Sequence, residues 1–173
     1  MNQDRRRIDE VLDPLFVDGL DELPLEELRR RRGLADEVEN ELSYYRRLLH
    51  GRLDLIRFEQ RRRAGEEERE LIDALVDVLS DAPSGGGRHT SHILTDLPPL
   101  PDVGRREIDQ VLDDNVLIRL DDASDDDLAE SVQTLVETAS EISAHRAEVQ
   151  RVADVLAGAV DRRHRTRSGS ETA

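Results

Sequence analysis

The chain contains two halves that align without a gap when one is shifted by 100 positions, so that Arg5 meets Arg105. The short stretch Arg5–Leu12 matches Arg105–Leu112, and polar residues further along each half match in the same register. An internal repeat of this kind indicates one structural plan used twice. Each half is therefore expected to fold like the other, and the two copies are expected to pack as an approximately two-fold object.

The composition favours a thin helical body over a thick globular core. Hydrophobic residues make up 36% of the 173 residues and charged residues 38%, with no tryptophan and no cysteine. The regular spacing of Leu, Val and Ile argues against disorder of the whole chain. The lack of cysteine excludes a disulfide framework, a thiol nucleophile and a Cys-ligated zinc site.

The charge and the hydropathy pattern bear on possible partners. A formal net charge of −15 disfavours direct binding to nucleic acid or to an anionic membrane. No apolar run is long enough to span a membrane, and the N-terminus lacks the apolar core of a signal peptide. The sequence thus predicts a cytoplasmic protein with neither membrane nor DNA as a partner.

Each half predicts a short leader helix followed by a long helix. The first long helix is expected to have Pro24 in its first turn and to run to about Ser80. The second is expected to use Ser124 as its N-cap and to run from Asp125 to about Val160. The predicted organisation is a first repeat at 1–81, a flexible Gly- and Pro-rich linker at 82–104, a second repeat at 105–160, and a disordered tail at 161–173.

One sector of each long helix carries a hydrophobic stripe at helical spacing. A long amphipathic helix must bury such a stripe, and the nearest partner is the other copy. The fold class predicted is therefore all-α: an antiparallel, coiled-coil-like hairpin of two long helices with short leader helices. The predicted seam consists of Leu42, Leu49, Leu53 and Ile56 in the first half, and Ile142, Val149, Ala153 and Leu156 in the second.

A polar line runs beside the seam on each long helix, within an arc of about 80° in the first half. Parallel helices would turn the two lines to opposite faces, whereas antiparallel helices let both lines open onto one face. If the lines act together, the hairpin is antiparallel and suits a two-fold-symmetric ligand. The lines are Glu39, Ser43, Arg46, His50 and Asp54, and then Ala139, Ser143, Arg146, Gln150 and Asp154.

The residue types in these lines match the hydrogen-bonding groups of guanine. Arginine can fork onto O6 and N7 of guanine or onto a phosphate, and aspartate can accept from the N1–H and N2–H groups. An ordinary solvated Arg–Asp ladder is the competing interpretation. Retention of the line in both halves favours a binding site that reads guanine or phosphate.

The lines resemble the nucleotide-binding signature of the RsiG-type anti-sigma factors of actinobacteria, Glu-x3-Ser-x2-Arg-x3-Gln-x3-Asp. The first half departs from it by His50 in place of glutamine, and the second by Ala139 in place of glutamate. This resemblance implies cyclic di-GMP, as a stacked pair of molecules, bound between antiparallel helices. It also implies that the loaded protein sequesters a sigma factor of the sporulation or flagellar type.

Roles for individual residues follow from the same resemblance. It implies that arginine and aspartate read guanine or phosphate, and that Glu39 acts in one half only. An acidic helical body would also suit the basic faces of a sigma factor. The implied readers are Arg46, Arg146, Asp54 and Asp154, with Ser43, Ser143, His50 and Gln150 completing the contacts.

Two other functions stay open at this stage. One is a ligand-free coiled-coil adaptor, and the other is a hydrolase whose site lies in the leaders. No nucleophile–base pair and no phosphate-binding glycine loop is found, so neither an enzyme nor a metal cofactor is expected. His89 and His92 in the linker lack further ligands. The runs Arg29–Arg32 and Arg61–Arg63 have acidic neighbours and are interpreted as solvated helical faces.

Overall fold

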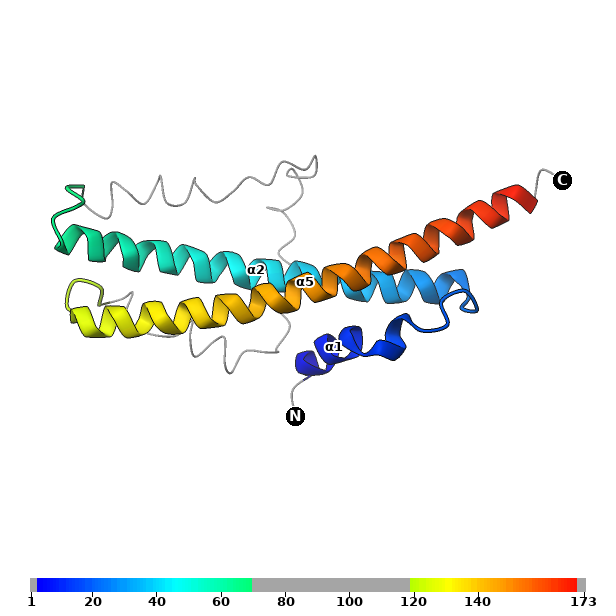
Figure 1. The fold of residues 1–173 in the computed structure, drawn as a ribbon, viewed down its shortest axis with the longest axis horizontal. Coiled ribbons are helices and arrows are strands. Elements are labelled where there is room, and N and C mark those ends of the chain that lie inside the picture. The colour runs from blue at the N-terminus through cyan, green and yellow to red at the C-terminus, as the bar shows by residue number, and fades with distance from the viewer. Residues whose placement is uncertain (1–2, 70–118, 171–173) are drawn as a thin grey trace. The chain divides into compact units, whose positions relative to one another are not determined.

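The computed structural model describes residues 3–69 and 119–170, and every regular element in these ranges is helical (Figure 1). This confirms the predicted all-α class. The predicted second leader helix at 105–112 and the predicted linker at 82–104 lie outside the described residues. The elements are the leader helix α1 (Gln3–Leu12), the 3-10 helix η1 (Pro14–Val17), and the long helices α2 (Leu25–Arg63) and α5 (Asp125–Ser170).

The chain forms two compact units that cut across both repeats. The first unit comprises Met1–Tyr44 and Glu141–Ala173, and the second comprises Tyr45–Ser140. Each unit therefore contains a segment of α2 and a segment of α5. This division follows from antiparallel pairing, which brings the beginning of one long helix beside the end of the other.

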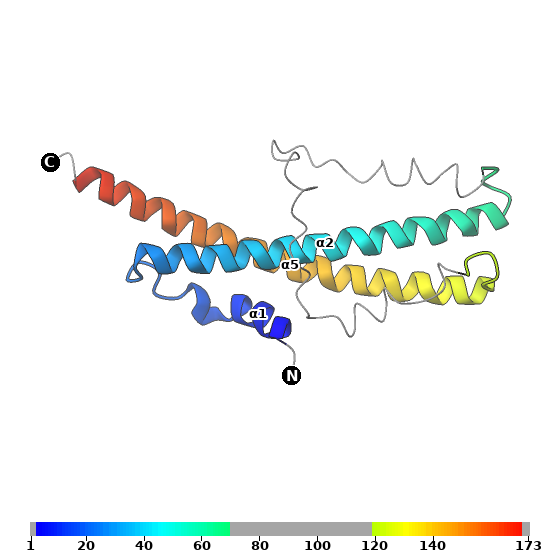
Figure 2. The same cartoon turned by 180° about the vertical axis from the view of Figure 1, so that it is seen from behind.

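Specific contacts define the antiparallel pairing inside each unit. In the first unit, Arg29 near the start of α2 contacts His164 near the end of α5 at 3.2 Å, whereas Ser43 bonds to the earlier residue Arg146. In the second unit, Arg63 at the end of α2 bonds to Asp125 at the start of α5 at 2.8 Å. Both views show the end of α2 beside the start of α5 in this unit (Figures 1 and 2).

The core lies along the predicted seam. Leucine, isoleucine and valine at seam positions are buried in both helices, and only Ala153 is half-buried. Burial of this stripe gives the main favourable contribution to folding, because apolar side chains leave water along the whole length of each helix. The buried seam residues are Leu42, Leu49, Leu53, Ile56, Ile142, Val149 and Leu156.

The first leader helix packs on α2 inside the first unit. Val11 and Phe16 are buried, and Arg7 of α1 forms an ion pair with Glu37 of α2 at 2.6 Å. Arg31 donates a hydrogen bond to the Phe16 carbonyl at 2.6 Å and lies 5.5 Å from the centre of the Phe16 ring. These contacts hold the first leader against the long helix that follows it.

Local signals fix where the long helices begin. Ser124 caps α5 as predicted: its Oγ accepts from the Asp127 backbone N–H at 3.1 Å, and Asp127 accepts from the Ser124 N–H at 3.0 Å. This reciprocal arrangement is a capping box with aspartate at its third position. In α2 the first helical residue is Leu25, and the carbonyl of Pro24 accepts the first helical hydrogen bond, from Leu28 N.

The expectation that the first long helix runs to about Ser80 was wrong, because α2 ends at Arg63. Gly65 follows with a φ of +74°, which L side chains rarely adopt. Its N–H bonds to the Arg62 carbonyl, and the N–H of Glu66 bonds to the Arg61 carbonyl. These two bonds form a Schellman motif, which satisfies the last carbonyls of the helix and turns the chain away from the helix axis.

The predicted disordered tail at 161–173 was also wrong over 161–170, where α5 continues as a helix to Ser170. Ala159 and Val160 are buried, so the helix is packed where the tail was expected to begin. Beyond them, Arg163 donates to the carbonyl of Asp21, and Arg162 lies 3.7 Å from the Asp21 carboxylate. Polar contacts of arginines thus hold a segment whose composition alone suggested disorder.

Candidate functional site

Three of the predicted site residues form a polar cluster within the first unit. Nε of Arg146 on α5 lies 2.7 Å from Oγ of Ser43 and 2.8 Å from Oε1 of Glu39, both on α2. The Ser43 hydroxyl donates to the same Glu39 oxygen at 2.9 Å. Glu39 and Ser43 meet because residues four apart lie on one face of a helix. The two polar lines therefore make direct contact from opposite helices at this level.

The ion pair between Arg146 and Glu39 is partly shielded from water. Their side chains are 32% and 22% exposed, respectively. Partial burial strengthens the attraction relative to a fully solvated pair, and the added hydroxyl of Ser43 satisfies the same guanidinium nitrogen. The cluster is thus an arginine positioned by two hydrogen-bonding side chains of the other helix.

Arg46 occupies the position in the first half that corresponds to Arg146, but its surroundings in the second unit are different. Its Nε is buried and has no hydrogen-bond partner among the described residues. The repeat places Ala139 where Glu39 stands in the other half, and Ala139 is buried without a carboxylate to offer. A buried N–H without a partner is costly. Nε of Arg46 is therefore a donor at a predicted ligand position for which the described part of the chain supplies no acceptor.

The other predicted site residues lie near or at the protein surface. In the second unit, His50 and Asp54 are exposed, and in the first unit Gln150 and Asp154 are exposed, with Ser143 half-buried. Exposed carboxylate and amide groups can form hydrogen bonds with a ligand without any rearrangement of the hydrophobic core. The structure therefore brings Glu39, Ser43 and Arg146 into contact and leaves the exposed side chains of His50, Asp54, Gln150 and Asp154 open to solvent.

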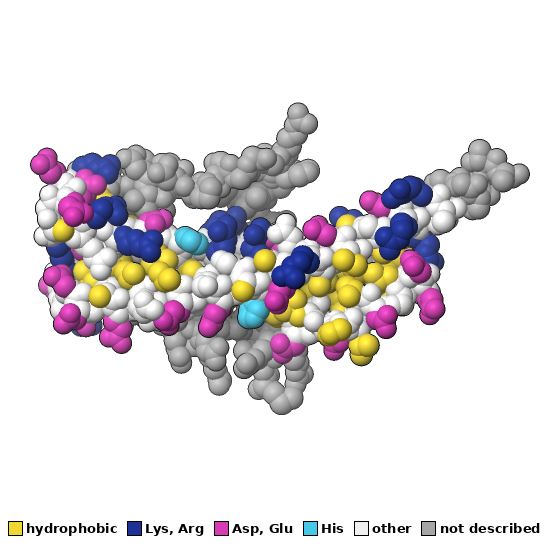
Figure 3. Space-filling view, in the orientation of Figure 1, with side chains coloured by type: hydrophobic (Ala, Val, Ile, Leu, Met, Phe, Trp, Pro, Cys, Tyr) yellow, Lys and Arg dark blue, Asp and Glu magenta, His cyan; other side chains and the backbone are white. Residues whose placement is uncertain are grey.

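Additional arginines add positive charge beside both lines. Arg47 and Arg151 are exposed, and Nε of Arg151 donates to the Ala147 carbonyl at 3.2 Å. Acidic and basic side chains are mixed on the face drawn in Figure 3, with bands of hydrophobic side chains between them. Local arginines of this kind are needed for an anionic ligand to bind a chain whose net charge is −15.

A further charged cluster, which the sequence reasoning missed, surrounds Glu59 in the second unit. The side chain of Glu59 is 1% exposed and accepts from Arg62 Nε at 2.7 Å and from Arg63 Nε at 2.8 Å. The hydrogen bond from Arg62, followed by that from Arg63, lowers the pKa of Glu59 below 4.5, although burial acts in the opposite direction. The cluster therefore favours the ionised carboxylate in the folded chain.

Arg63 links this cluster to the segment that precedes α5. It donates to the carbonyl of Leu120 and to that of Ala123, both at 2.7 Å. The interpretation of Arg61–Arg63 as a solvated face was therefore incomplete, because Arg62 and Arg63 keep some exposure to solvent and also pair with the buried Glu59. The missed signal was Glu59, three and four residues before them, at the spacing of an ion pair on a helix.

Among residues 3–69 and 119–170, no group of three or more His, Asp or Glu side chains is arranged to hold a metal ion. His89 and His92 lie outside these ranges. A cavity of about 470 Å³ lies beside the start of α5, and it is lined by none of the predicted site residues. Its lining is Arg119, Asp122, Ala123, Asp127, Glu130, Ser131 and Thr134.

A comparison with known protein families finds a match that covers α2. Residues 16–80 match the model of the RsiG-like family. The matched stretch contains all of α2, and with it the line from Glu39 to Asp54, so the resemblance noted from the sequence is confirmed there. The match supports the role of an anti-sigma factor. No curated protein matches the chain.

Hydropathy gives one further observation on the described helices. Within residues 3–69 and 119–170, no helix combines the length and the apolar character that crossing a membrane requires.

Proposed function

We propose that this protein is an anti-sigma factor that binds cyclic di-GMP between α2 and α5 and, when loaded, holds a sporulation- or flagellar-type sigma factor inactive. The observation that carries the proposal is the cluster of Arg146, Ser43 and Glu39, in which the polar lines of the two helices meet. A solvated salt-bridge ladder on a single helix would not require such a contact. The RsiG-like match over the same helix supports the proposal independently.

The side chains suit a guanine nucleotide with two phosphates. Arg46 and Arg146 supply guanidinium donors for O6 and N7 of guanine or for phosphate oxygens. The carboxylates of Asp54 and Asp154 accept from the N1–H and N2–H groups of the base. A stacked pair of ligand molecules needs no aromatic platform from the protein, because the bases stack on each other and on the arginine planes. The buried Nε of Arg46, which has no acceptor within residues 3–69 and 119–170, fits such a ligand.

The neutral and titratable side chains would complete the contacts. Ser43, Ser143 and Gln150 offer hydrogen bonds that carry no charge, and His50 stands where the family signature has glutamine. Histidine changes its charge near neutral pH, so it adds a donor on acidification that glutamine lacks. The two halves are therefore expected to contact the ligand through corresponding positions, but with different side chains at His50 and Gln150.

The charge of the chain suits the proposed protein partner. A net charge of −15 attracts basic faces, such as those with which a sigma factor approaches nucleic acid, and speeds association with them. Ligand binding would place further negative charge beside α2 and α5. Loading is thus expected to strengthen the attraction for a basic partner while it fixes the two helices.

Isothermal titration with cyclic di-GMP tests the nucleotide part of the proposal. Wild type is expected to bind, and Arg46→Ala, Arg146→Ala and Asp154→Ala are each expected to lose at least about tenfold in affinity, since each removes a charged hydrogen bond. Cyclic di-AMP is the matched ligand, because it keeps the phosphates and changes the base. Equal affinity for the two would show that the carboxylates do not read guanine.

A pull-down with a sporulation-type sigma factor tests the partner part. Capture that rises with cyclic di-GMP and falls in Arg146→Ala is expected. Capture without any response to nucleotide would favour a ligand-independent coiled-coil adaptor. One observation favours that second function: Arg146 already has protein partners in Glu39 and Ser43, as a purely structural side chain would. Titration of the wild type separates the two, because the adaptor gives no heat with the nucleotide.

A further inference from the structure

We infer that Glu39 is an internal competitor for the ligand, with its carboxylate occupying the anion-binding edge of Arg146 until a phosphate or guanine displaces it. This inference rests on the proposed function and adds a regulatory element to the same site. Its basis is the ion pair between Glu39 Oε1 and Arg146 Nε, whose atoms lie 2.8 Å apart beside the hydrogen bond from the same nitrogen to Ser43. A ligand oxygen that bonds to Nε must take the place of that carboxylate.

Ser43 keeps the competing carboxylate in position. Its hydroxyl donates to the Glu39 oxygen that faces Arg146, at 2.9 Å, and lies 2.7 Å from Arg146 Nε itself. Both partners are on α2, one turn apart, so the carboxylate is held by its own helix before α5 contributes. Exchange with a ligand therefore breaks an organised three-residue cluster, which costs more than freeing a side chain that points into water.

The other half of the repeat lacks this competitor. Ala139 stands at the position that corresponds to Glu39, and Arg46 has no ion pair and an unsatisfied buried Nε among the described residues. Arg46 can thus accept an anion without exchange, and the ligand supplies the missing acceptor. The two arginines hold equivalent positions in the repeat, but only Arg146 must break an ion pair before it can bind a ligand. Arg46 is therefore expected to bind ligand before Arg146 does.

The Glu39→Gln substitution separates competition from direct ligand contact. Glutamine keeps the shape and can still bond to Ser43 and Arg146, but it removes the charge that opposes an incoming phosphate. Affinity for cyclic di-GMP is expected to rise about two- to fivefold by isothermal titration, the range for one partly exposed ion pair. Glu37→Gln is the matched control, because Glu37 is also paired with an arginine, Arg7, and is expected to leave affinity unchanged.

The reciprocal substitution, Ala139→Glu, places a carboxylate at the corresponding position of the other half. Affinity is expected to fall by a similar factor, because Arg46 then also has a competitor. Far-UV circular dichroism and a thermal melt identify any loss of fold in this variant, since Ala139 is buried. If Ala139→Glu does not fold, Glu39→Gln with its Glu37→Gln control still decides the question.

The outcomes distinguish the inference from the function on which it rests. No binding by wild type and none by Glu39→Gln overturns both the proposed nucleotide site and the competitor. Binding by wild type that Glu39→Gln leaves unchanged or weakens overturns the competitor alone and makes Glu39 a direct ligand contact. Tighter binding in Glu39→Gln, with Glu37→Gln equal to wild type, supports the competitor.

Discussion

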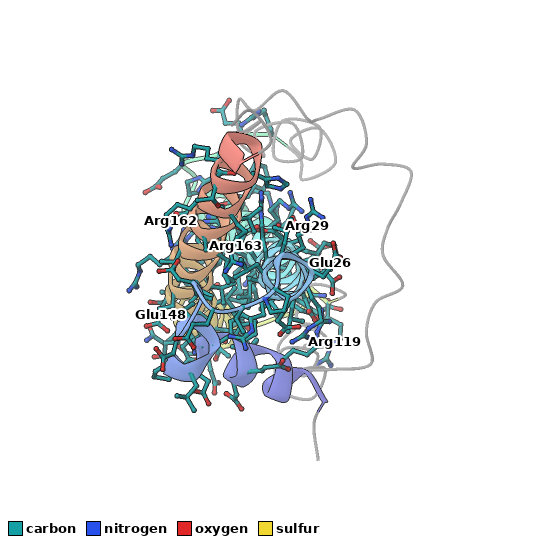
Figure 4. All side chains as sticks on the ribbon, turned by 90° about the vertical axis from the view of Figure 1, so that its right-hand side faces the viewer. Glu26, Arg29, Arg119, Glu148, Arg162 and Arg163 are labelled. Carbon is teal, nitrogen blue, oxygen red and sulfur yellow. The ribbon has the colours of Figure 1, made fainter. Side chains whose placement is uncertain are left out.

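The last turn of α2 corresponds in the repeat to a turn inside α5 that ends at Arg163, and the two turns use their paired arginines in different ways. In α2, Arg62 and Arg63 both bond to the buried carboxylate of Glu59. In α5, Ala159 stands at the position of Glu59, and the corresponding arginines reach outward to Asp21. Figure 4 labels these two, Arg162 and Arg163, on α5. Both pairs thus contact the segment before a long helix, but only one pair is organised around a buried acid.

The same comparison explains why the two helices end differently. Gly65 follows α2 with a positive φ and allows the Schellman motif, whereas Arg165 holds the corresponding position in α5. An arginine would be strained at such a φ, and the α5 helix continues through this position to Ser170. Both halves therefore retain the arginines that join a long helix to the segment before the other one. The difference between Glu59 and Ala159 determines whether those arginines pair with a buried acid, and the difference between Gly65 and Arg165 determines whether the helix ends there.

Removing the buried acid should give the largest effect on stability. Glu59→Ala leaves Arg62 and Arg63 beside a space without counter-charge, which is expected to lower the free energy of unfolding by about 1–3 kcal/mol, less than for a fully buried pair because both arginines retain some water. Urea unfolding followed by circular dichroism measures it. The control is Glu37→Ala, whose side chain is 69% exposed and whose loss should cost under about 1 kcal/mol. Equal effects of the two substitutions would contradict a special role for Glu59.

The pH dependence of that contribution should follow the sign of the pKa shift. Arg62 and then Arg63 lower the pKa of Glu59 in the folded chain below 4.5, so its stabilisation is fully present above pH 4.5 and is lost as the pH falls through the folded-state pKa. The difference in unfolding free energy between wild type and Glu59→Gln should therefore shrink below pH 4.5. Glu27 and Glu67, whose pKa values arginine hydrogen bonds lower to about 2, are present in both proteins and cancel. A difference that stays constant from pH 7 to pH 3 would refute the assignment.

Glycine-to-alanine substitution is expected to change stability in opposite directions at the end of α2 and inside it. Gly65→Ala forces a side chain onto a φ of +74° and should destabilise the chain by about 1 kcal/mol. Gly51→Ala lies inside α2 with nothing within 4 Å of the added methyl group, and should stabilise by about 0.5–1 kcal/mol. Thermal unfolding of both variants checks this pair. Stabilisation by Gly65→Ala would mean that the Schellman motif does not set the end of the helix.

Most of the correctly predicted fold came from the helical spacing of hydrophobic and capping residues. The seam from Leu42 to Ile56 and the capping box at Ser124 depend on spacing within one helix, and both are present in the structure. The ends of the two long helices were misjudged for different reasons. The end of α2 was signalled locally by Gly65, which the prediction did not take into account. The continuation of α5 past residue 160 is supported by the hydrogen bond from Arg163 to the Asp21 carbonyl, which joins residues far apart in the sequence.

The candidate site was predictable in its residue types and less so in its pairing. The repeat identified Ser43 and Arg146 as members of matching lines, and the structure shows them in contact. The family resemblance implied that Glu39 acts in one half only, but only coordinates reveal that its carboxylate meets Arg146. The sequence also does not show that Nε of Arg46 is buried without a hydrogen-bond partner in the described ranges, because this depends on which side chains the packed structure places near it.

Restoring the acid to α5 should produce the smallest effect and tests the comparison from the other side. Ala159→Glu places a carboxylate three and four residues before Arg162 and Arg163, the spacing found around Glu59. Two new ion pairs are worth about 0.5 kcal/mol, offset in part by the cost of placing a larger side chain where Ala159 is buried. A melting temperature within a few degrees of wild type is therefore expected, together with loss of the Arg163 contact to Asp21 as the arginines turn towards the new acid. If Arg163 still contacts Asp21 in a structure of this variant, the segment before α2 determines where the α5 arginines lie. By analogy, Glu59 would then not be what positions Arg62 and Arg63 in α2.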